Sequence, residues 1–310
     1  MNVADIDRGT KCRDILTVPG TDIVLPITRI CGNLPGQTLL VTGGVHGGEY
    51  PGIEAAIRFA AGLDAERLRG AVVVVHLSNP LAFFAKSQYV VPQDGKNLNR
   101  VFPGKATGTM AERIAYAIAT MAQEADYWVD LHGGDLHEAL VPFAIYSDQG
   151  RSEVVEQARA MAEAYGIPYI LESSAIGGGT YTSAARMGIP AILTEAGQVG
   201  QLDEEAVQIH LDGLENILRA LGFVPEALAA QAPSQIFRQF MWTNAPETGL
   251  FYRAITAGQW IKKGDKAGQI CNPYGDKVAE IQASQDGVVL FVATSLAINQ
   301  GDPLFAVAAP

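Results

Sequence analysis

The seven-residue run Ala71–Leu77 (AVVVVHL) has one polar side chain and constrains the fold more than any other feature of this sequence. Valine is enriched in β-strands, and a strand that is apolar on both faces is typical of a parallel sheet covered by helices on both sides. The run therefore predicts an α/β fold with a sheet buried between two layers of helices.

Strand-type and helix-type segments alternate around this run. The predicted strands are Thr21–Cys31, Gln37–Thr42, Tyr127–Leu131, Pro168–Leu171 and Ala191–Thr194. The predicted helices begin near Pro51 or span Glu112–Gln123, Ser152–Tyr165, Tyr181–Met187 and Asp203–Leu221. Proline suits a first helical turn, and aspartate suits an N-cap. The alternation indicates a mostly parallel sheet, whose functional site is expected at the carboxyl ends of its strands.

The pattern changes near Pro225. From Gly249 onward the helix signal is weak, and short β-type runs are separated by Gly-Asp turns. These runs are Gly249–Thr256, Val278–Ala283, Gly287–Ala293 and Leu304–Val307. We therefore predict an α/β domain over residues 1–224 and a small β-rich domain over residues 225–310.

Charge and composition narrow the classes of partner. The net charge is -11 and there is no run rich in lysine and arginine, which argues against nucleic-acid binding. There is no apolar run near the ~20 residues of a membrane span, and the polar segment Met1–Arg13 lacks the apolar core of a signal peptide. Three cysteines without C-x-x-C spacing indicate reduced thiols. We expect a cytoplasmic protein without membrane partners; its oligomeric state stays open.

A glycine-rich loop carries the first chemical signal. In Gly43–Glu49 (GGVHGGE), His46 and Glu49 lie three residues apart, directly after a predicted strand. Imidazole nitrogen and carboxylate oxygen are both zinc ligands, and the flanking glycines permit the sharp bend that would bring the two together. The same segment is also compatible with a glycine-rich turn that carries two incidental polar residues.

Two further segments follow predicted strands and supply polar side chains. His132 lies in DLHGG and completes a set of two histidines and one glutamate, the ligand set of a catalytic zinc with an open fourth position. Asp130 in the same segment either partners a ligand or only ends the strand. Glu195 in TEAG is either a general base for water or a strand-end carboxylate facing solvent.

The segment Asn97–Gly104 (NLNRVFPG) places Asn99 beside Arg100. A guanidinium binds a carboxylate through paired hydrogen bonds, so this pair is a candidate site for a substrate carboxylate. Alternatively, the arginine closes a loop. The remaining histidines are interpreted as structural or surface residues. His76 is expected to be a hydrogen-bonded core residue and His210 to be structural, while His137 either belongs to a surface turn, the favoured interpretation, or lines the pocket.

Together the four motifs resemble the succinylglutamate desuccinylase/aspartoacylase family, a branch of the zinc carboxypeptidase-like fold. The motifs that carry the resemblance are GGVHGGEYPG from Gly43, NLNRVFPG from Asn97, DLHGG from Asp130 and TEAG from Thr194. Their order and spacing match the family over about residues 20–220. The β-type runs after Gly249 resemble the C-terminal domain of the family more weakly.

The resemblance implies a role for each matching residue. One zinc ion per chain would be bound by His46, Glu49 and His132, and Glu195 would be the general base and proton shuttle. Asn99 and Arg100 would hold a carboxylate of the substrate. The implied reaction is zinc-dependent hydrolysis of the amide bond of a small N-acyl amino acid, with zinc activating water.

One departure from the family pattern concerns the arginine that often precedes the NLNR-type motif and polarises the scissile carbonyl. This chain has Gln88 there, with Lys86 nearby. Either residue can donate a hydrogen bond to a developing oxyanion, although Gln88 does so without charge. Two alternative functions therefore stay open: a zinc carboxypeptidase that trims peptides, and a metabolite-binding homologue with weak catalysis. The intact set of ligands and base argues against the second.

Overall fold

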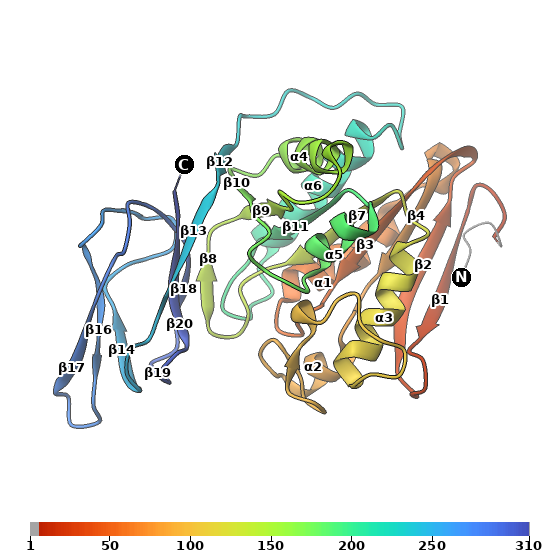
Figure 1. Ribbon diagram of the computed structural model, residues 1–310. Helices are drawn as coiled ribbons and strands as arrows, with labels where there is room; N and C mark the ends of the chain where they lie inside the picture. The colour runs from red at the N-terminus through yellow and green to blue at the C-terminus, as the bar shows by residue number, and fades with distance from the viewer. Residues whose placement is uncertain (1–5, 310) are drawn as a thin grey trace.

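The structure, a computed structural model, describes residues 6–309, so the first five residues of the polar segment Met1–Arg13 lie outside it. Figure 1 shows a larger lobe of strands and helices and a smaller lobe built from strands of the C-terminal part of the chain. Within residues 6–309, no helix is both long and apolar enough to cross a bilayer.

A nine-stranded sheet forms the centre of the larger lobe. Its strands are β1 (Thr10–Thr17), β2 (Val24–Cys31), β3 (Leu34–Gly43), β4 (Arg69–Val75), β7 (Tyr127–His132), β9 (Phe143–Tyr146), β10 (Tyr169–Glu172), β11 (Ala191–Glu195) and β12 (Gln235–Phe237). Their order is β1-β2-β4-β3-β7-β11-β9-β10-β12. The central strands β4, β3, β7 and β11 run parallel, whereas β1, β2 and β9 each make antiparallel pairs. The predicted mostly parallel sheet is confirmed, with antiparallel pairs that make it mixed.

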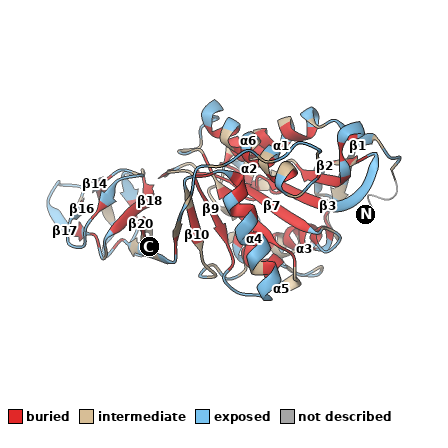
Figure 2. Ribbon diagram, turned by 90° about the horizontal axis from the view of Figure 1, so that it is seen from above, coloured by how far each residue is buried: buried red, intermediate tan, exposed pale blue. Residues whose placement is uncertain are grey.

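Helices cover both faces of this sheet. They are α1 (Tyr50–Gly62), α2 (Pro80–Ala85), α3 (Met110–Ala122), α4 (Ser152–Tyr165), α5 (Thr180–Met187) and α6 (Glu204–Ala220). Val72 and Val74 of β4 belong to the core cluster formed with α1, α4 and α6, while Val73 and Val75 belong to the cluster formed with α3 and α5. Alternate side chains of a strand point to opposite faces, so one valine run fills two cores. Figure 2 shows the buried sheet between helices with exposed outer surfaces.

Local sequence signals set the starts of two helices as expected. Pro51 lies in the first turn of α1. Asp203 is the N-cap of α6, where its carboxylate accepts a hydrogen bond from the Glu205 backbone N at 3.1 Å. The sheet order itself was not evident in the sequence. Although only a short turn joins β2 to β3, strand β4 lies between them and pairs with both.

The smaller lobe contains two antiparallel sheets packed around an apolar core. Its strands are β13 (Gln239–Asn244), β14 (Gly249–Arg253), β15 (Trp260–Ile261), β16 (Lys266–Cys271), β17 (Lys277–Gln282), β18 (Gly287–Ala293), β19 (Ala297–Ile298) and β20 (Pro303–Ala309). This confirms the predicted β-rich C-terminal part.

Strand pairing links the two lobes. Strand β8 (Glu138–Leu140) leaves the larger lobe and pairs with β18 of the smaller one. In the other direction, β12 lies beyond residue 225 and still pairs with β10 of the large sheet. The division at residues 224 and 225 stays a prediction, and the last strand of the large sheet ends at Phe237.

We expect the substitution Gly213→Ala to destabilise the fold by about 2–3 kcal/mol, because overpacking a filled core costs roughly that much. A Cβ atom at Gly213 of α6 would lie 2.2 Å from the ring of Tyr165 on α4, a side chain that is 2% exposed. Urea denaturation would measure the loss. The matched control is Gly62→Ala at the end of α1, where an added Cβ has no neighbour within 4 Å. Equal stabilities of the two variants would contradict this account of the packing.

Candidate metal centre

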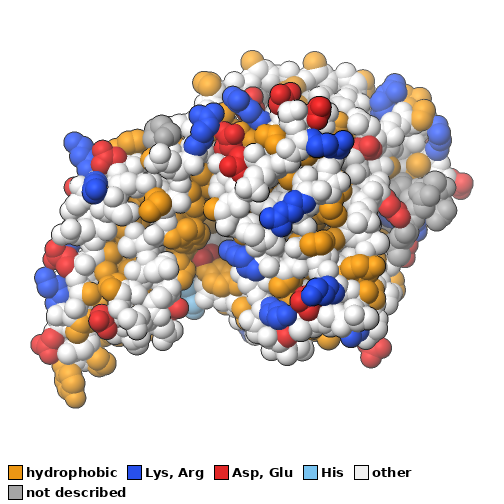
Figure 3. Space-filling model, viewed as in Figure 1, with side chains coloured by type: hydrophobic (Ala, Val, Ile, Leu, Met, Phe, Trp, Pro, Cys, Tyr) orange, Lys and Arg blue, Asp and Glu red, His pale blue; other side chains and the backbone are white. Residues whose placement is uncertain are grey.

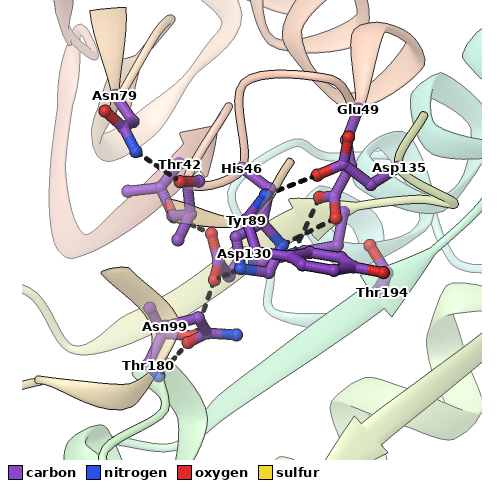
Figure 4. A network of polar contacts seen from close by, with 12 residues as sticks. Thr42, His46, Glu49, Asn79, Tyr89, Asn99, Asp130, Asp135, Thr180 and Thr194 are labelled. Carbon is purple, nitrogen blue, oxygen red and sulfur yellow. Dashed lines mark hydrogen bonds and ion pairs between the residues drawn. The ribbon is translucent and has the colours of Figure 1, made fainter. Parts of the chain in front are cut away.

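Three side chains predicted as metal ligands converge in the structure. One ligand atom each from His46, Glu49 and His132 lies within 4.8 Å of the other two, and all three residues are buried. His46 lies in the loop after β3, Glu49 is the N-cap of α1, and His132 is the last residue of β7. Because β3 and β7 are adjacent parallel strands, their carboxyl ends meet at one edge of the sheet. Figure 4 shows His46 and Glu49 pointing toward one another above Asp130.

The glycines of the ligand loop serve two purposes. Gly44 has a φ of +69°, which supports the sharp bend expected from the sequence. Gly47 and Gly48 are needed for close approach instead. A Cβ atom would lie 2.3 Å from the Phe83 backbone N at Gly47 and 2.0 Å from Asp135 Oδ1 at Gly48. The loop is thus pressed against α2 and against the segment that follows β7.

Both histidines turn the same ring nitrogen toward Glu49. Nδ1 of His46 lies 2.7 Å from Glu49 Oε1, and Nδ1 of His132 lies 2.9 Å from Glu49 Oε2. The opposite nitrogens are held by fixed acceptors: Nε2 of His132 is 2.8 Å from Asp130 Oδ2, and Nε2 of His46 is 3.1 Å from Asn97 Oδ1. A ligating imidazole typically makes such a contact through its second nitrogen, which fixes the orientation of the ring.

Asp130 is buried and its carboxylate is fully engaged. Beside His132, it accepts hydrogen bonds from the hydroxyls of Thr42 and Thr180. Of the two readings that the sequence left open for Asp130, the structure therefore supports the partner of a ligand. Thr42 and Thr180 were not singled out by sequence analysis, since threonine at a strand or helix end carries no specific signal.

The electrostatics of the three ligands fit a cation. Burial raises the pKa of Glu49, but the positive charges of His46 and His132 outweigh it and bring the pKa to about 2. Burial lowers the pKa of His132, yet Asp130 and Glu49 hold it well above its ordinary value. The buried carboxylates thus stabilise positive charge at this point. Two imidazole nitrogens and a carboxylate also match the donor set of zinc, so the residues present fit that ion.

Glu195 lies beside the three ligands. It is the last residue of β11, and the parallel register places it opposite His132 of β7. Its Oε2 atom is buried and makes no hydrogen bond with any described residue. Burial and the negative charge of Glu49 raise its pKa well above the ordinary value. The carboxylate is therefore positioned beside the ligands with one oxygen available.

These residues line one cavity of about 310 Å³ between the two lobes. Its polar lining includes Tyr89, Asn97, Asn99, Arg100 and Glu138, together with the three ligands and Glu195. Its apolar lining includes Leu140, Phe143, Ile145, Ile176, Leu193, Phe240, Trp242, Phe291 and Pro303. Phe240 and Trp242 belong to β13, so the smaller lobe forms part of the wall. Figure 3 shows apolar side chains gathered where the lobes meet.

The two residues predicted to hold a substrate carboxylate both line this cavity. Asn99 is buried, and its Oδ1 accepts a hydrogen bond from the Thr180 backbone N at 2.9 Å. Arg100 donates from Nη1 to the Asn99 carbonyl at 2.8 Å, and no carboxylate among the described residues forms an ion pair with it. Burial lowers the pKa of Arg100, although a guanidinium stays protonated in proteins.

Gln88 and Lys86 lie farther from the ligands. Gln88 lines a neighbouring cavity of about 270 Å³, and Lys86 is exposed at the end of α2. Tyr89 lines both cavities, and its ring packs edge-on against His46 with centroids 5.6 Å apart. The predicted role of Gln88 in substrate binding stays a prediction. The sequence signal for Tyr89 was only its position beside Gln88.

The remaining histidines lie outside the set of candidate ligands. His76 is hydrogen-bonded as predicted, through Nε2 to Thr28 Oγ1 at 2.8 Å, but it follows β4 and is half-buried, so its prediction as a core residue was wrong. His137 is exposed. His210 is buried in α6, where Nε2 lies 3.0 Å from the His132 carbonyl, so it supports the strand that carries a ligand.

Comparison with known proteins agrees with the geometry. The model of the succinylglutamate desuccinylase/aspartoacylase catalytic domain matches residues 35–221, more than half of the chain. The chain belongs to this family. An N-alpha-acetyl-L-2,4-diaminobutyric acid deacetylase of Halomonas elongata is 30% identical in an alignment of length 295 that covers 92% of this chain and 86% of the relative. A succinylglutamate desuccinylase of Pseudomonas aeruginosa is 28% identical in an alignment of length 227 that covers 66% of each chain.

Solved structures of the family resemble the whole chain. The product-bound ectoine utilization protein EutE (DoeB) from Ruegeria pomeroyi has a TM-score of 0.89 at 29% identity, covering 98% of this chain and 97% of that one. A succinylglutamate desuccinylase/aspartoacylase from Rhodobacter sphaeroides has a TM-score of 0.86 at 27% identity, with the same coverage. The similarity therefore includes the smaller lobe as well as the catalytic domain.

We expect Asp130→Asn to weaken zinc binding about 10- to 100-fold, because Nε2 of His132 would lose its charged partner. Competition with a chelator would measure the affinity for zinc. His137→Ala is the matched control, since it removes an exposed histidine five residues beyond His132 and should leave the affinity unchanged. An Asp130→Asn protein that binds zinc as tightly as the wild type would contradict the role of Asp130.

Proposed function

We propose that this protein is a zinc-dependent amidohydrolase that removes the acyl group from a small N-acyl amino acid. The observation that carries the proposal is one cavity that combines His46, Glu49 and His132 with the carboxylate of Glu195 and the guanidinium of Arg100. The relative from Halomonas elongata, a deacetylase of an N-acetylated amino acid, supports the same reaction class.

The metal would be held by His46, Glu49 and His132. Zinc bound by three protein ligands polarises a carbonyl group and makes water more acidic. The chain contributes the environment: Asp130 and Asn97 orient the imidazoles, and the apolar cavity wall limits the access of bulk water.

In this proposal, Glu195 transfers protons between the attacking water and the departing amine. Hydrolysis breaks the amide C–N bond and forms a C–O bond with water, so one proton must leave the attacking water and one must reach the departing amine. A carboxylate beside the ligands, with an oxygen free of protein partners, can perform both transfers in turn. The raised pKa of Glu195 favours this role, because a shuttle must accept a proton at neutral pH and then release it.

In this proposal, Arg100 binds the carboxylate of the amino acid substrate. It is the one lysine or arginine side chain that lines the cavity within residues 6–309. A planar guanidinium forms two parallel hydrogen bonds with a carboxylate, which fixes the orientation of the substrate as well as its affinity. The backbone contact from Arg100 to Asn99, together with the Thr180 contact to Asn99, holds this corner of the cavity in place.

The shape of the cavity favours a small substrate over a peptide. A carboxypeptidase needs a groove that accepts a chain extending out of the site. Here β13 and β18 of the smaller lobe close one side with Phe240, Trp242 and Phe291. A volume of about 310 Å³ lies at the low end for small-molecule sites, and it suits an acylated amino acid.

We expect Glu195→Gln to lower kcat by about 1,000-fold or more while one zinc ion per chain is retained, because the variant loses the proton shuttle but no ligand. The measurements are elemental analysis and amine release from a panel of N-acetyl and N-succinyl amino acids. Glu172→Gln is the matched control, since Glu172 ends the strand β10 and pairs with Arg238 outside the cavity. Wild-type protein that binds no zinc, or full activity of Glu195→Gln, would overturn the proposal.

We expect Arg100→Lys to raise KM about 10- to 100-fold with a smaller effect on kcat, because lysine keeps the charge but loses the paired hydrogen bonds. Steady-state kinetics with the best substrate of the panel would measure the change. The control is the analogue whose carboxylate is replaced by a carboxamide. Its KM should differ little between the wild type and Arg100→Lys. Equal effects on the carboxylate and carboxamide substrates would contradict the assignment.

A further inference from the structure

The cavity contains a carboxylate that the proposed reaction does not use. Three glutamates line it, and two of them already have roles: Glu49 as a ligand and Glu195 as the proton shuttle. The third, Glu138, belongs to no motif and was not singled out in the sequence. It is six residues beyond His132, at the start of β8.

Glu138 is held rigidly on both sides. Its backbone N donates to the Asp135 carbonyl at 3.0 Å, and its carbonyl accepts from the Val199 backbone N at 2.7 Å. The pairing of β8 with β18 places it opposite Ala293 of the smaller lobe. Its side chain accepts a hydrogen bond from the Tyr89 hydroxyl at Oε1 and one from the Asp135 backbone N at Oε2. The carboxylate is therefore preorganised.

The carboxylate of Glu138 has unused capacity for a positive charge. An ionised carboxylate offers about four acceptor positions, and the two hydrogen bonds just described come from neutral donors. None of the ion pairs formed between described residues includes Glu138. A carboxylate that is removed from water without a cationic partner is costly, so a bound cation would offset the cost.

The surroundings of Glu138 are also negative. Burial raises its pKa to about 7, and the charges of Glu49 and Asp135 act in the same direction. The neighbouring cavity of about 270 Å³ shares Tyr89 and Glu138 with the first and is lined by Asp302 but by no lysine or arginine. Arg100 is the one lysine or arginine among the described lining of the first cavity, and its charge acts on Glu138 without forming an ion pair with it. The two cavities thus meet at a carboxylate that forms no ion pair with a cationic side chain of the described residues.

We propose that Glu138 determines substrate specificity by binding a second, protonated amino group, so that the substrate is a mono-N-acylated diamino acid. The inference rests on the proposed function and deepens it. The substrate carboxylate binds Arg100, the acylated nitrogen lies at the metal ligands, and the free ammonium group binds Glu138. All three groups line the same cavity of about 310 Å³.

Three substrates of equal chain length test this assignment. Nα-acetyl-L-2,4-diaminobutyrate, N-acetyl-L-norvaline and N-acetyl-L-glutamate carry a positive, a neutral and a negative end. For the wild type, we expect kcat/KM to fall in that order. Glu138→Gln keeps an acceptor for the Tyr89 hydroxyl but removes the charge, so kcat/KM for the cationic substrate should fall about 100-fold and that for the neutral one should stay within about threefold.

The comparison separates a specificity role from a structural one. If Glu138 only holds Tyr89 in place, Glu138→Gln will change kcat/KM for all three substrates by the same factor, and the inference is overturned. A wild-type preference for the neutral or negative substrate also overturns it. Asp302→Asn makes the same charge change in the neighbouring cavity. It should leave unchanged the ratio of kcat/KM for the cationic substrate to kcat/KM for the neutral one. An equal shift of that ratio in Asp302→Asn would show a general field effect and refute the assignment to Glu138.

Binding provides a readout that does not depend on turnover. Titration calorimetry of the same three compounds would be performed on Glu195→Gln and on the double variant Glu195→Gln/Glu138→Gln. We expect the preference for the cationic compound to disappear in the double variant. Failure of the wild type to cleave any compound, with this preference intact, would count against the hydrolase function but not against Glu138. If Glu195→Gln binds the cationic compound no more tightly than the other two, the inference is overturned, even if the wild type hydrolyses all three.

Discussion

The parallel alignment of β3, β7 and β11 is the constraint on which the rest of the site depends. Adjacent parallel strands end at the same edge of a sheet, so the residues that follow or end them are brought within reach of one another. Here that edge collects His46 after β3, His132 at the end of β7 and Glu195 at the end of β11. Helices on both faces bury the strands, and the alternating valines of β4 contribute to both cores.

Buried charge at this edge is tolerated because each charged group faces its opposite. Asp130 contacts one side of His132, and Glu49 contacts the other side and also His46. Glu195 departs from this rule, since one of its oxygens is buried without a protein partner. An isolated buried carboxylate is costly, and such groups are concentrated at functional sites. The departure therefore agrees with a catalytic role for Glu195 better than with a structural one.

The smaller lobe converts a strand-edge site into a cavity of defined size and charge. Its strands contribute Phe240, Trp242 and Phe291 to the wall, and its pairing with β8 fixes Glu138 at the junction of two cavities. In the proposals made above, the larger lobe supplies the chemistry, and the junction between the lobes selects the substrate.

Motifs with short, fixed spacing could be interpreted from the sequence alone. The α/β fold followed from apolar runs, and His46, Glu49, His132 and Glu195 were candidates because each lies just after or at the end of a predicted strand. The resemblance to a family then gave each candidate a role. The roles of Asp130 and Glu138 and the position of Tyr89 depended on tertiary structure. Contacts such as Thr42 to Asp130 join residues 88 positions apart, and sheet order, not sequence spacing, decides such contacts. The sequence by itself thus determined the residue types needed for chemistry, and only the folded chain decided which charges would face one another in the cavity.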